Sequence, residues 1–165
     1  KVETPTTYLA TIQFENDCII QITLSFDVVA HRRNHIELYG NKGSIIVPDP
    51  NMFGGSAFVS VTAGGNWGEH KTEMMPLGKI NIKSQSSRAN ESPTNANYRG
   101  AGLSEMAHAI ENNLEHRCNG ELSLHVLDII DSTMRASQTG IPQEIKTTCK
   151  KPKPFTLEEI KKILN

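Results

Sequence analysis

The chain has 165 residues and a formal net charge of −1. A nearly neutral chain lacks the broad positive field that would attract nucleic acid or an anionic membrane surface, so neither is expected as a partner. The length suits a single domain over residues 1–165, with a core that needs no metal ion or disulfide.

Hydropathy and cysteine usage narrow the class further. No run of 18 apolar residues occurs and no signal peptide opens the sequence, so a cytoplasmic location is the default expectation. Three cysteines lie far apart without a CxxC pair, which is typical of reduced thiols, and no metal site is predicted: they are Cys18, Cys118 and Cys149. Because the first residues run almost directly into a strand, we expect the chain to be a piece of a longer protein.

Two alternating segments open the chain. Residues 8–15 and 20–28 alternate apolar and polar side chains at a period of two, with the turn signal Asn16-Asp17 between them. The pattern predicts an antiparallel hairpin with one apolar face. The opposite face is polar and suits either water or the sheet of a partner: Gln21, Thr23 and Ser25.

The clearest hairpin is predicted between Asn34 and Asn51. The residues from Gly40 to Gly43 supply glycines that accept positive φ at low cost, so the chain can reverse into the apolar strand 44–47. Two prolines then end the pairing, and Asp49 and Asn51 beside them are expected to cap the turn. Further strands are predicted over residues 57–63 and 69–75.

Helical periodicity replaces strand periodicity after a polar stretch from Leu77 to Tyr98, which predicts a long loop. The inner arc of the first helix is predicted to contain Leu103, Met106, Ala107, Ile110 and Leu114, with Glu105 outside it. A second helix is predicted with Ser123 as its N-cap and a stop at Gly140. Its inner face is predicted to contain Val126, Leu127, Ile130 and Met134.

Two elements are predicted after the second helix. Residues 143–148 can form a last strand around Ile145. Thr156 and Glu159 form a capping box that predicts a terminal helix from Leu157 to Leu164. Strands first and helices afterwards indicate an α+β domain, with one mainly antiparallel, open-faced sheet and helices packed on one face.

Two polar groups are candidates for ligand contact. Five consecutive side chains form the densest cluster and could bind the hydroxyls or carboxylate of a small ligand, or form a solvated corner: His31, Arg32, Arg33, Asn34 and His35. Tyr98 and Arg99 precede a helix N-terminus, where an anion or a sugar could bind. The alternative for Arg99 is a loop-to-helix junction in which it pairs with a nearby Glu.

Cofactor and catalytic motifs are missing from the sequence. The two glycine-rich segments are residues 40–43 and 99–102, and neither of them both follows a strand and opens a helix. The chain by itself is therefore not expected to bind a nicotinamide cofactor. No GxSxG, HExxH or paired-cysteine motif occurs, and no catalytic residue is predicted within the chain.

Three segments together resemble the C-terminal domain of the Gfo/Idh/MocA oxidoreductases, a family that includes glucose-fructose oxidoreductase and inositol dehydrogenase. They are IELYGNKGSIIVPDPNMFGG, NYRGAGLSEMAHAIENN and GELSLHVLDIIDSTMRASQTG, in this order. The resemblance implies an NAD- or NADP-dependent dehydrogenase acting on a sugar or cyclitol, with the cofactor bound by a Rossmann domain upstream of Lys1. It also implies that the catalytic Lys, Asp and His lie upstream.

The same resemblance assigns a role to this chain. It implies homo-oligomer formation through the outer face of the sheet and a strand-end corner, at His31 to His35, that reaches toward substrate; Tyr98 and Arg99 come second. A competing hypothesis from another class is a stand-alone carbohydrate-binding or protein-interaction module. A native start codon at this boundary would favour the module, whereas a cofactor-binding segment upstream would favour the dehydrogenase.

Overall fold

The computed structural model describes residues 2–51, 53–79 and 98–164. Its contacts fall into two compact units: Lys1–Arg33 with His125–Thr147 (unit 1), and Asn34–Leu124 with Thr148–Asn165 (unit 2). The single domain expected over the whole chain stays a prediction. None of the helices in the described residues combines the length and the apolar character that a membrane span needs. The loop predicted between Leu77 and Tyr98 lies largely outside the described residues.

Unit 1 contains the first predicted hairpin. Strands β1 (Thr7–Gln13) and β2 (Ile19–Ser25) pair antiparallel, with Ala10 opposite Ile22, as the alternation predicts. Asp27 lies at the open end of the hairpin and accepts hydrogen bonds from Thr6 Oγ1 at 2.5 Å and Thr7 Oγ1 at 2.8 Å. These two bonds lower the pKa of Asp27, because they favour its ionised form.

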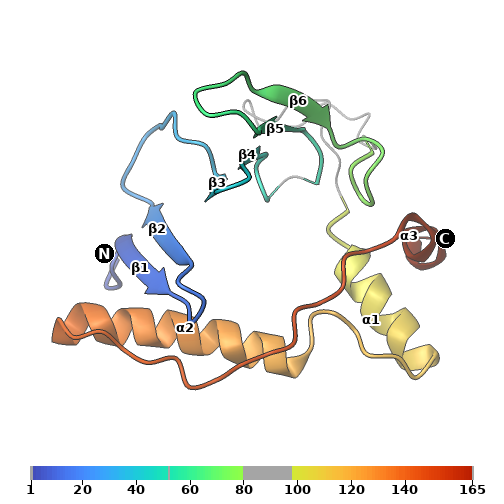
Figure 1. The fold of residues 1–165 in the computed structure, drawn as a ribbon. Coiled ribbons are helices and arrows are strands. Elements are labelled where there is room, and N and C mark those ends of the chain that lie inside the picture. Colours follow the sequence, from blue (N-terminus) through green and yellow to red (C-terminus); the bar gives the residue numbers. More distant parts are fainter. Residues whose placement is uncertain (1, 52, 80–97, 165) are drawn as a thin grey trace. The chain divides into compact units, whose positions relative to one another are not determined.

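Unit 2 contains a four-stranded antiparallel sheet in the order β3-β4-β5-β6 (Figure 1). The strands are β3 (Ile36–Gly40), β4 (Gly43–Val47), β5 (Ser56–Ser60) and β6 (Gly68–Lys71). The turn between β3 and β4 needs glycine at Gly43, where φ is 155° and a Cβ would lie 2.8 Å from the Ser60 carbonyl oxygen. The hairpin predicted between Asn34 and Asn51 is confirmed.

The α+β class and the antiparallel pairing are confirmed, but the strands of the described residues form two sheets rather than one. The strand predicted over residues 143–148 is wrong. This segment instead runs along α2 (Gly120–Thr139), where Asp128 Oδ2 accepts hydrogen bonds from the N–H groups of Lys146 and Thr147, both at 3.0 Å. A carboxylate thereby takes the place of a strand partner. Helix packing on a sheet face stays a prediction.

Helix α1 (Ala101–Glu111) packs against α3 (Leu157–Leu164) within unit 2. The buried stripe of α1 consists of Ala101, Glu105 and Ala109. The prediction that the apolar arc forms the inner face of this helix is therefore wrong. Leu103 is 74% exposed and Ile110 is 67% exposed. Alanines on the stripe permit close approach of α3, whose Ile160 and Ile163 are buried.

The ends of α2 and α3 have clear local causes. Asn119, not Ser123, caps α2, because its side-chain oxygen accepts the Leu122 N–H at 3.0 Å. Gly140 ends α2 with φ 68°, as predicted. The capping box of α3 is confirmed by the Thr156 N–H to Glu159 Oε2 bond of 2.7 Å and the Glu159 N–H to Thr156 Oγ1 bond of 3.2 Å.

The predicted inner face of α2 is not a closed core in this structure. Its four apolar side chains remain between 37% and 59% exposed: Val126, Leu127, Ile130 and Met134. Ser132 is the buried residue of this helix, at 2% exposure. Periodicity therefore located the helix correctly without identifying what its apolar side contacts.

Candidate functional site

The cluster from His31 to His35 is divided between the two units. His31, Arg32 and Arg33 follow β2 and belong to unit 1, whereas Asn34 and His35 lead into β3 and belong to unit 2. All five side chains are exposed. Unit 2 also contains Tyr98 and Arg99, the second candidate pair, so it provides residues from both predicted groups.

The residues after β4 form a tight polar turn. Asp49 Oδ1 accepts the Asn51 N–H at 2.9 Å, which closes an Asx turn between the two prolines that end the strand. Its other carboxylate oxygen lies 3.7 Å from Nε2 of His35, an ion pair when the imidazole is protonated. Asp49 therefore contacts both Asn51 and His35, the residue directly before β3.

Asn51 extends this chain of contacts to the second candidate pair. A terminal nitrogen of Arg99 donates to Asn51 Oδ1 at 2.9 Å and to the Asn51 carbonyl oxygen at 3.4 Å, across 48 residues of sequence. His35, Asp49, Asn51 and Arg99 consequently form one connected set, which we call the turn site. The structure thus brings together two residues that the sequence placed in separate groups.

Tyr98 is held next to the turn site by contacts of its own. Its ring packs edge-on against Phe53 with centroids 5.9 Å apart, and its hydroxyl donates to the Lys79 carbonyl oxygen at 2.9 Å. The Tyr98 carbonyl oxygen accepts the Ala101 N–H at 2.8 Å, which joins this junction directly to α1. Tyr98 therefore anchors Arg99 between the sheet side and the helix.

The start of β3 carries a second small polar group. Asn34 Nδ2 donates to Glu37 Oε1 at 2.7 Å, so the Asn34 amide is held by the strand that follows it. Desolvation and, after it, the charge of Glu37 raise the pKa of Tyr39, because both disfavour the phenolate.

The turn site combines an imidazole, a carboxylate, an amide and a guanidinium on an exposed surface. Such a set can exchange hydrogen bonds with neighbouring hydroxyl groups, since it offers both donors and acceptors. Across the described residues, no group of three or more His, Cys, Asp or Glu side chains converges as a metal-binding set. The arrangement suits the orientation of a polar ligand.

Sequence reasoning assigned Asp49 and Asn51 to turn capping, and that role is confirmed for Asp49. Their part in joining His35 to Arg99 was not predicted. The available signal was the Pro-Asp-Pro-Asn order at the end of a strand, which directs two short polar side chains away from the ladder. Nothing local indicated that Arg99 would be their neighbour.

A family model described as the oxidoreductase family, C-terminal alpha/beta domain, of the Gfo/Idh/MocA type, matches residues 2–145. This range includes the whole turn site and ends before α3. Comparison with curated proteins and with solved structures gave no match.

Proposed function

The chain belongs to the Gfo/Idh/MocA oxidoreductase family as a C-terminal alpha/beta domain, and from this premise we propose that it orients a sugar or cyclitol substrate for an NAD- or NADP-dependent dehydrogenase. The turn site is the surface that we assign to this task. Asn34 and Tyr98, which adjoin His35 and Arg99 in sequence, are further candidate contacts in unit 2, and His31, Arg32 and Arg33 are candidate contacts in unit 1.

The observation that carries this proposal is the bond between Arg99 and Asn51. It connects the junction before α1 with the His35–Asp49 pair at the sheet, so four polar side chains from distant parts of unit 2 converge. A polyol presents several hydroxyl groups on one small ring, and binding each requires a donor or acceptor at a defined position. A preorganised chain of contacts meets this requirement better than independent surface side chains.

The chemistry of the reaction requires residues outside this chain. The nicotinamide would supply the carbon that accepts a hydride from a ring C–H, and a base would take the hydroxyl proton. We propose that both lie in the preceding part of the enzyme. The residues of this chain would bind the hydroxyls away from the reacting carbon and hold the ring in one orientation.

Arg99→Met in the enzyme that carries this domain tests the assignment. The loss of one charged hydrogen bond to substrate should raise KM about tenfold, with a smaller effect on kcat, because the contact acts on ground state and transition state alike. Arg135→Met is the matched control, since Arg135 lies on α2 in unit 1 and pairs with Asp131 at 3.2 Å. Unchanged KM values for both Arg99→Met and His35→Ala would contradict the proposal.

A second measurement separates the dehydrogenase from the stand-alone module. The chain by itself should show no dehydrogenase turnover and no measurable NAD(H) binding by calorimetry. Micromolar NAD(H) affinity would contradict the division of labour proposed here. Sugar binding by the isolated chain that is as strong as binding by the whole enzyme would instead favour a carbohydrate-binding module.

We also propose that the chain forms a homo-oligomer through the outer face of the β1–β2 pair. This face combines hydroxyl and amide side chains with Leu9, which is 78% exposed, and Ile19, which is 61% exposed. Thr23→Lys should shift the mass measured by light scattering toward the monomer, because it places a charge in the contact. Thr4→Lys, an exposed position before β1, is the control, and a monomeric unmodified chain would contradict the proposal.

A further inference from the structure

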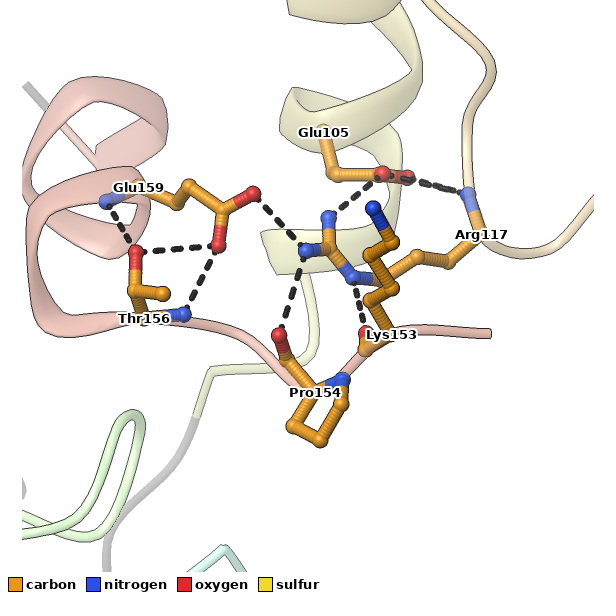
Figure 2. A network of polar contacts seen from close by, with 6 residues as sticks. All are labelled: Glu105, Arg117, Lys153, Pro154, Thr156 and Glu159. Atoms are coloured by element: carbon orange, nitrogen blue, oxygen red, sulfur yellow. Dashed lines mark hydrogen bonds and ion pairs between the residues drawn. The ribbon is translucent and has the colours of Figure 1, made fainter. Parts of the chain in front are cut away.

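Arg117 is the centre of the densest polar network in the described part of unit 2 (Figure 2). Its guanidinium lies 3.0 Å from Glu105 Oε1 on α1 and 2.9 Å from Glu159 Oε1 on α3. Nε donates to the Lys153 carbonyl oxygen at 2.7 Å, and a terminal nitrogen donates to the Pro154 carbonyl oxygen at 3.4 Å. One side chain thus joins α1, the loop after it and the segment that leads into α3.

The α1 side of this network reaches the turn site in two steps. Glu105 is 6% exposed and also accepts the Arg117 N–H at 3.1 Å, so its position is fixed from two directions. One helical turn earlier on the same stripe is Ala101, 4% exposed, whose N–H donates to the Tyr98 carbonyl oxygen. Since Arg99 follows Tyr98 directly, the placement of α1 determines the direction from which Arg99 approaches Asn51.

The α3 side of the network depends on α3 being docked. Glu159 accepts from Arg117 with one carboxylate oxygen and from the Thr156 N–H with the other. Phe155, immediately before the capping box, places its ring 3.9 Å from the Arg117 guanidinium carbon. An eight-residue helix is marginal by itself, so the burial of its apolar side and these contacts maintain it.

The C-terminal helix lies outside the range of the family match, which ends at residue 145. Its docking is therefore a feature of this chain that the family assignment leaves undescribed. Arg117 lies within the matched range but finds three of its partners, Lys153, Pro154 and Glu159, beyond it. The residue connects the site-bearing part of unit 2 to this terminal segment.

We propose that Arg117 is a positioning residue that couples the docking of α3 to the orientation of Arg99 in the turn site. The idea rests on the proposed function for its relevance to substrate, but the coupling itself is a property of the free chain. Undocking of α3 removes one carboxylate and two carbonyl partners from Arg117. The Arg117–Glu105 contact then loses its support, and the first turn of α1 and the Tyr98–Arg99 junction loosen with it.

Amide hydrogen exchange of the full chain without ligand tests the coupling. Arg117→Met should speed exchange of the α3 amides at least tenfold and exchange of the Ala101 and Ser104 amides at least threefold. The amides of the β4–β5 ladder should keep their rates. The exchange rates of Arg117→Lys should fall between those of the unmodified chain and those of Arg117→Met, because an ammonium preserves the charge opposite Glu105 without contacting all partners at once. Arg135→Met should leave all three sets unchanged.

Glu159→Gln covers the case in which Arg117→Met does not fold. Gln retains a capping-box side chain while removing the charge opposite Arg117, so only the α3 side of the network is weakened. The α3 amides should exchange faster, with Ala101 and Ser104 following to a smaller extent. Faster exchange confined to α3 would overturn the coupling, as would an equal rise in the β4–β5 ladder, which indicates general destabilisation.

Kinetics of the enzyme then distinguish this proposal from the proposed function. If both hold, Arg117→Met raises KM in the same direction as Arg99→Met and leaves kcat less affected, and Arg117→Lys restores part of the loss. Coupled exchange with unchanged KM values for both Arg99→Met and His35→Ala would refute the substrate role of the turn site alone. A raised KM for Arg99→Met without coupled exchange would refute the role of Arg117 alone.

Discussion

Arg117 and Arg99 lie in the same unit, but their guanidinium groups have different surroundings. Arg117 is 22% exposed and contacts two carboxylates, two carbonyl oxygens and an aromatic ring. Arg99 is exposed, and its guanidinium donates to the side-chain and backbone oxygens of Asn51. An arginine enclosed by carboxylates stabilises the fold, whereas the exposed Arg99 is the arginine that we propose contacts substrate.

The electrostatics of Arg117 support this distinction. Desolvation disfavours its charged form, but the hydrogen bonds to Glu159 and Glu105 outweigh it and raise the pKa of Arg117. Arginine is always charged in proteins, and in Arg117 this charge lies opposite two carboxylates. The comparison predicts a large stability effect at Arg117 and a small one at Arg99.

Replacement of Arg117 should have the largest effect on stability. Arg117→Met leaves Glu105 buried without its cation and should lower the free energy of local opening of the α1–α3 pair by about 3–5 kcal/mol, measured by amide exchange. Arg99→Met should cost less than about 0.5 kcal/mol, as expected for a surface substitution. Equal losses at the two positions would remove the distinction between them.

Gly55→Ala tests whether the close approach of Gly55 to Pro48, next to the turn site, requires glycine. Gly55 has φ 124°, and a Cβ there would lie 2.9 Å from Pro48 Cβ, directly before Asp49. The strain should cost about 1–3 kcal/mol in thermal or chemical unfolding. Gly102→Ala is the control: no atom lies within 4 Å of its added Cβ, and helical alanine should be neutral or stabilising. Comparable destabilisation by both would argue against a specific clash.

Thr156→Ala tests how far α3 depends on its cap. The substitution removes the hydroxyl that accepts the Glu159 N–H and should cost about 1 kcal/mol. The loss should be visible as faster amide exchange in α3. Thr156→Ser, which keeps the hydroxyl, should preserve most of the protection. Failure of serine to do so would show that the methyl group, rather than the cap, matters.

Acid should weaken the Arg117 network by a smaller amount. The Thr156 N–H, followed by Arg117, lowers the pKa of Glu159 from 4.5 to about 2. A depressed carboxyl pKa contributes stability that is present above pH 4.5 and is lost as the pH falls toward 2. Because the side chain is 45% exposed, solvent screening limits the effect to less than about 1 kcal/mol. Glu159→Gln should remove this pH dependence from α3 protection.

Local signals in the sequence predicted the hairpins, the stop at Gly140 and the capping box of α3, since each depends on residues within a few positions of one another. The buried face of α1 could not be predicted in this way. Periodicity counts apolar residues, and it places Glu105 outside because the arginine that compensates its charge comes twelve residues later. The hydrogen bonds from Lys146 and Thr147 to Asp128, which replace the predicted last strand, likewise join residues that are far apart in the sequence.

The candidate site was predicted in part. Composition identified His35 and Arg99 as polar residues near element ends, and the family resemblance favoured the first of them. Their connection through Asp49 and Asn51 depends on how the turn after β4 meets the junction before α1. Such a contact across 48 residues is set by the fold and has no local signature.

The position of α3 also affects how the protein should be divided for expression. A boundary drawn after residue 145, where the family match ends, would discard Lys153, Pro154 and Glu159 and leave Arg117 beside Glu105 at a freshly exposed helix surface. Ile163 is 8% exposed, so a boundary placed within α3 would likewise remove a packed side chain. A boundary for expression is therefore better placed beyond α3 than at the end of the family match.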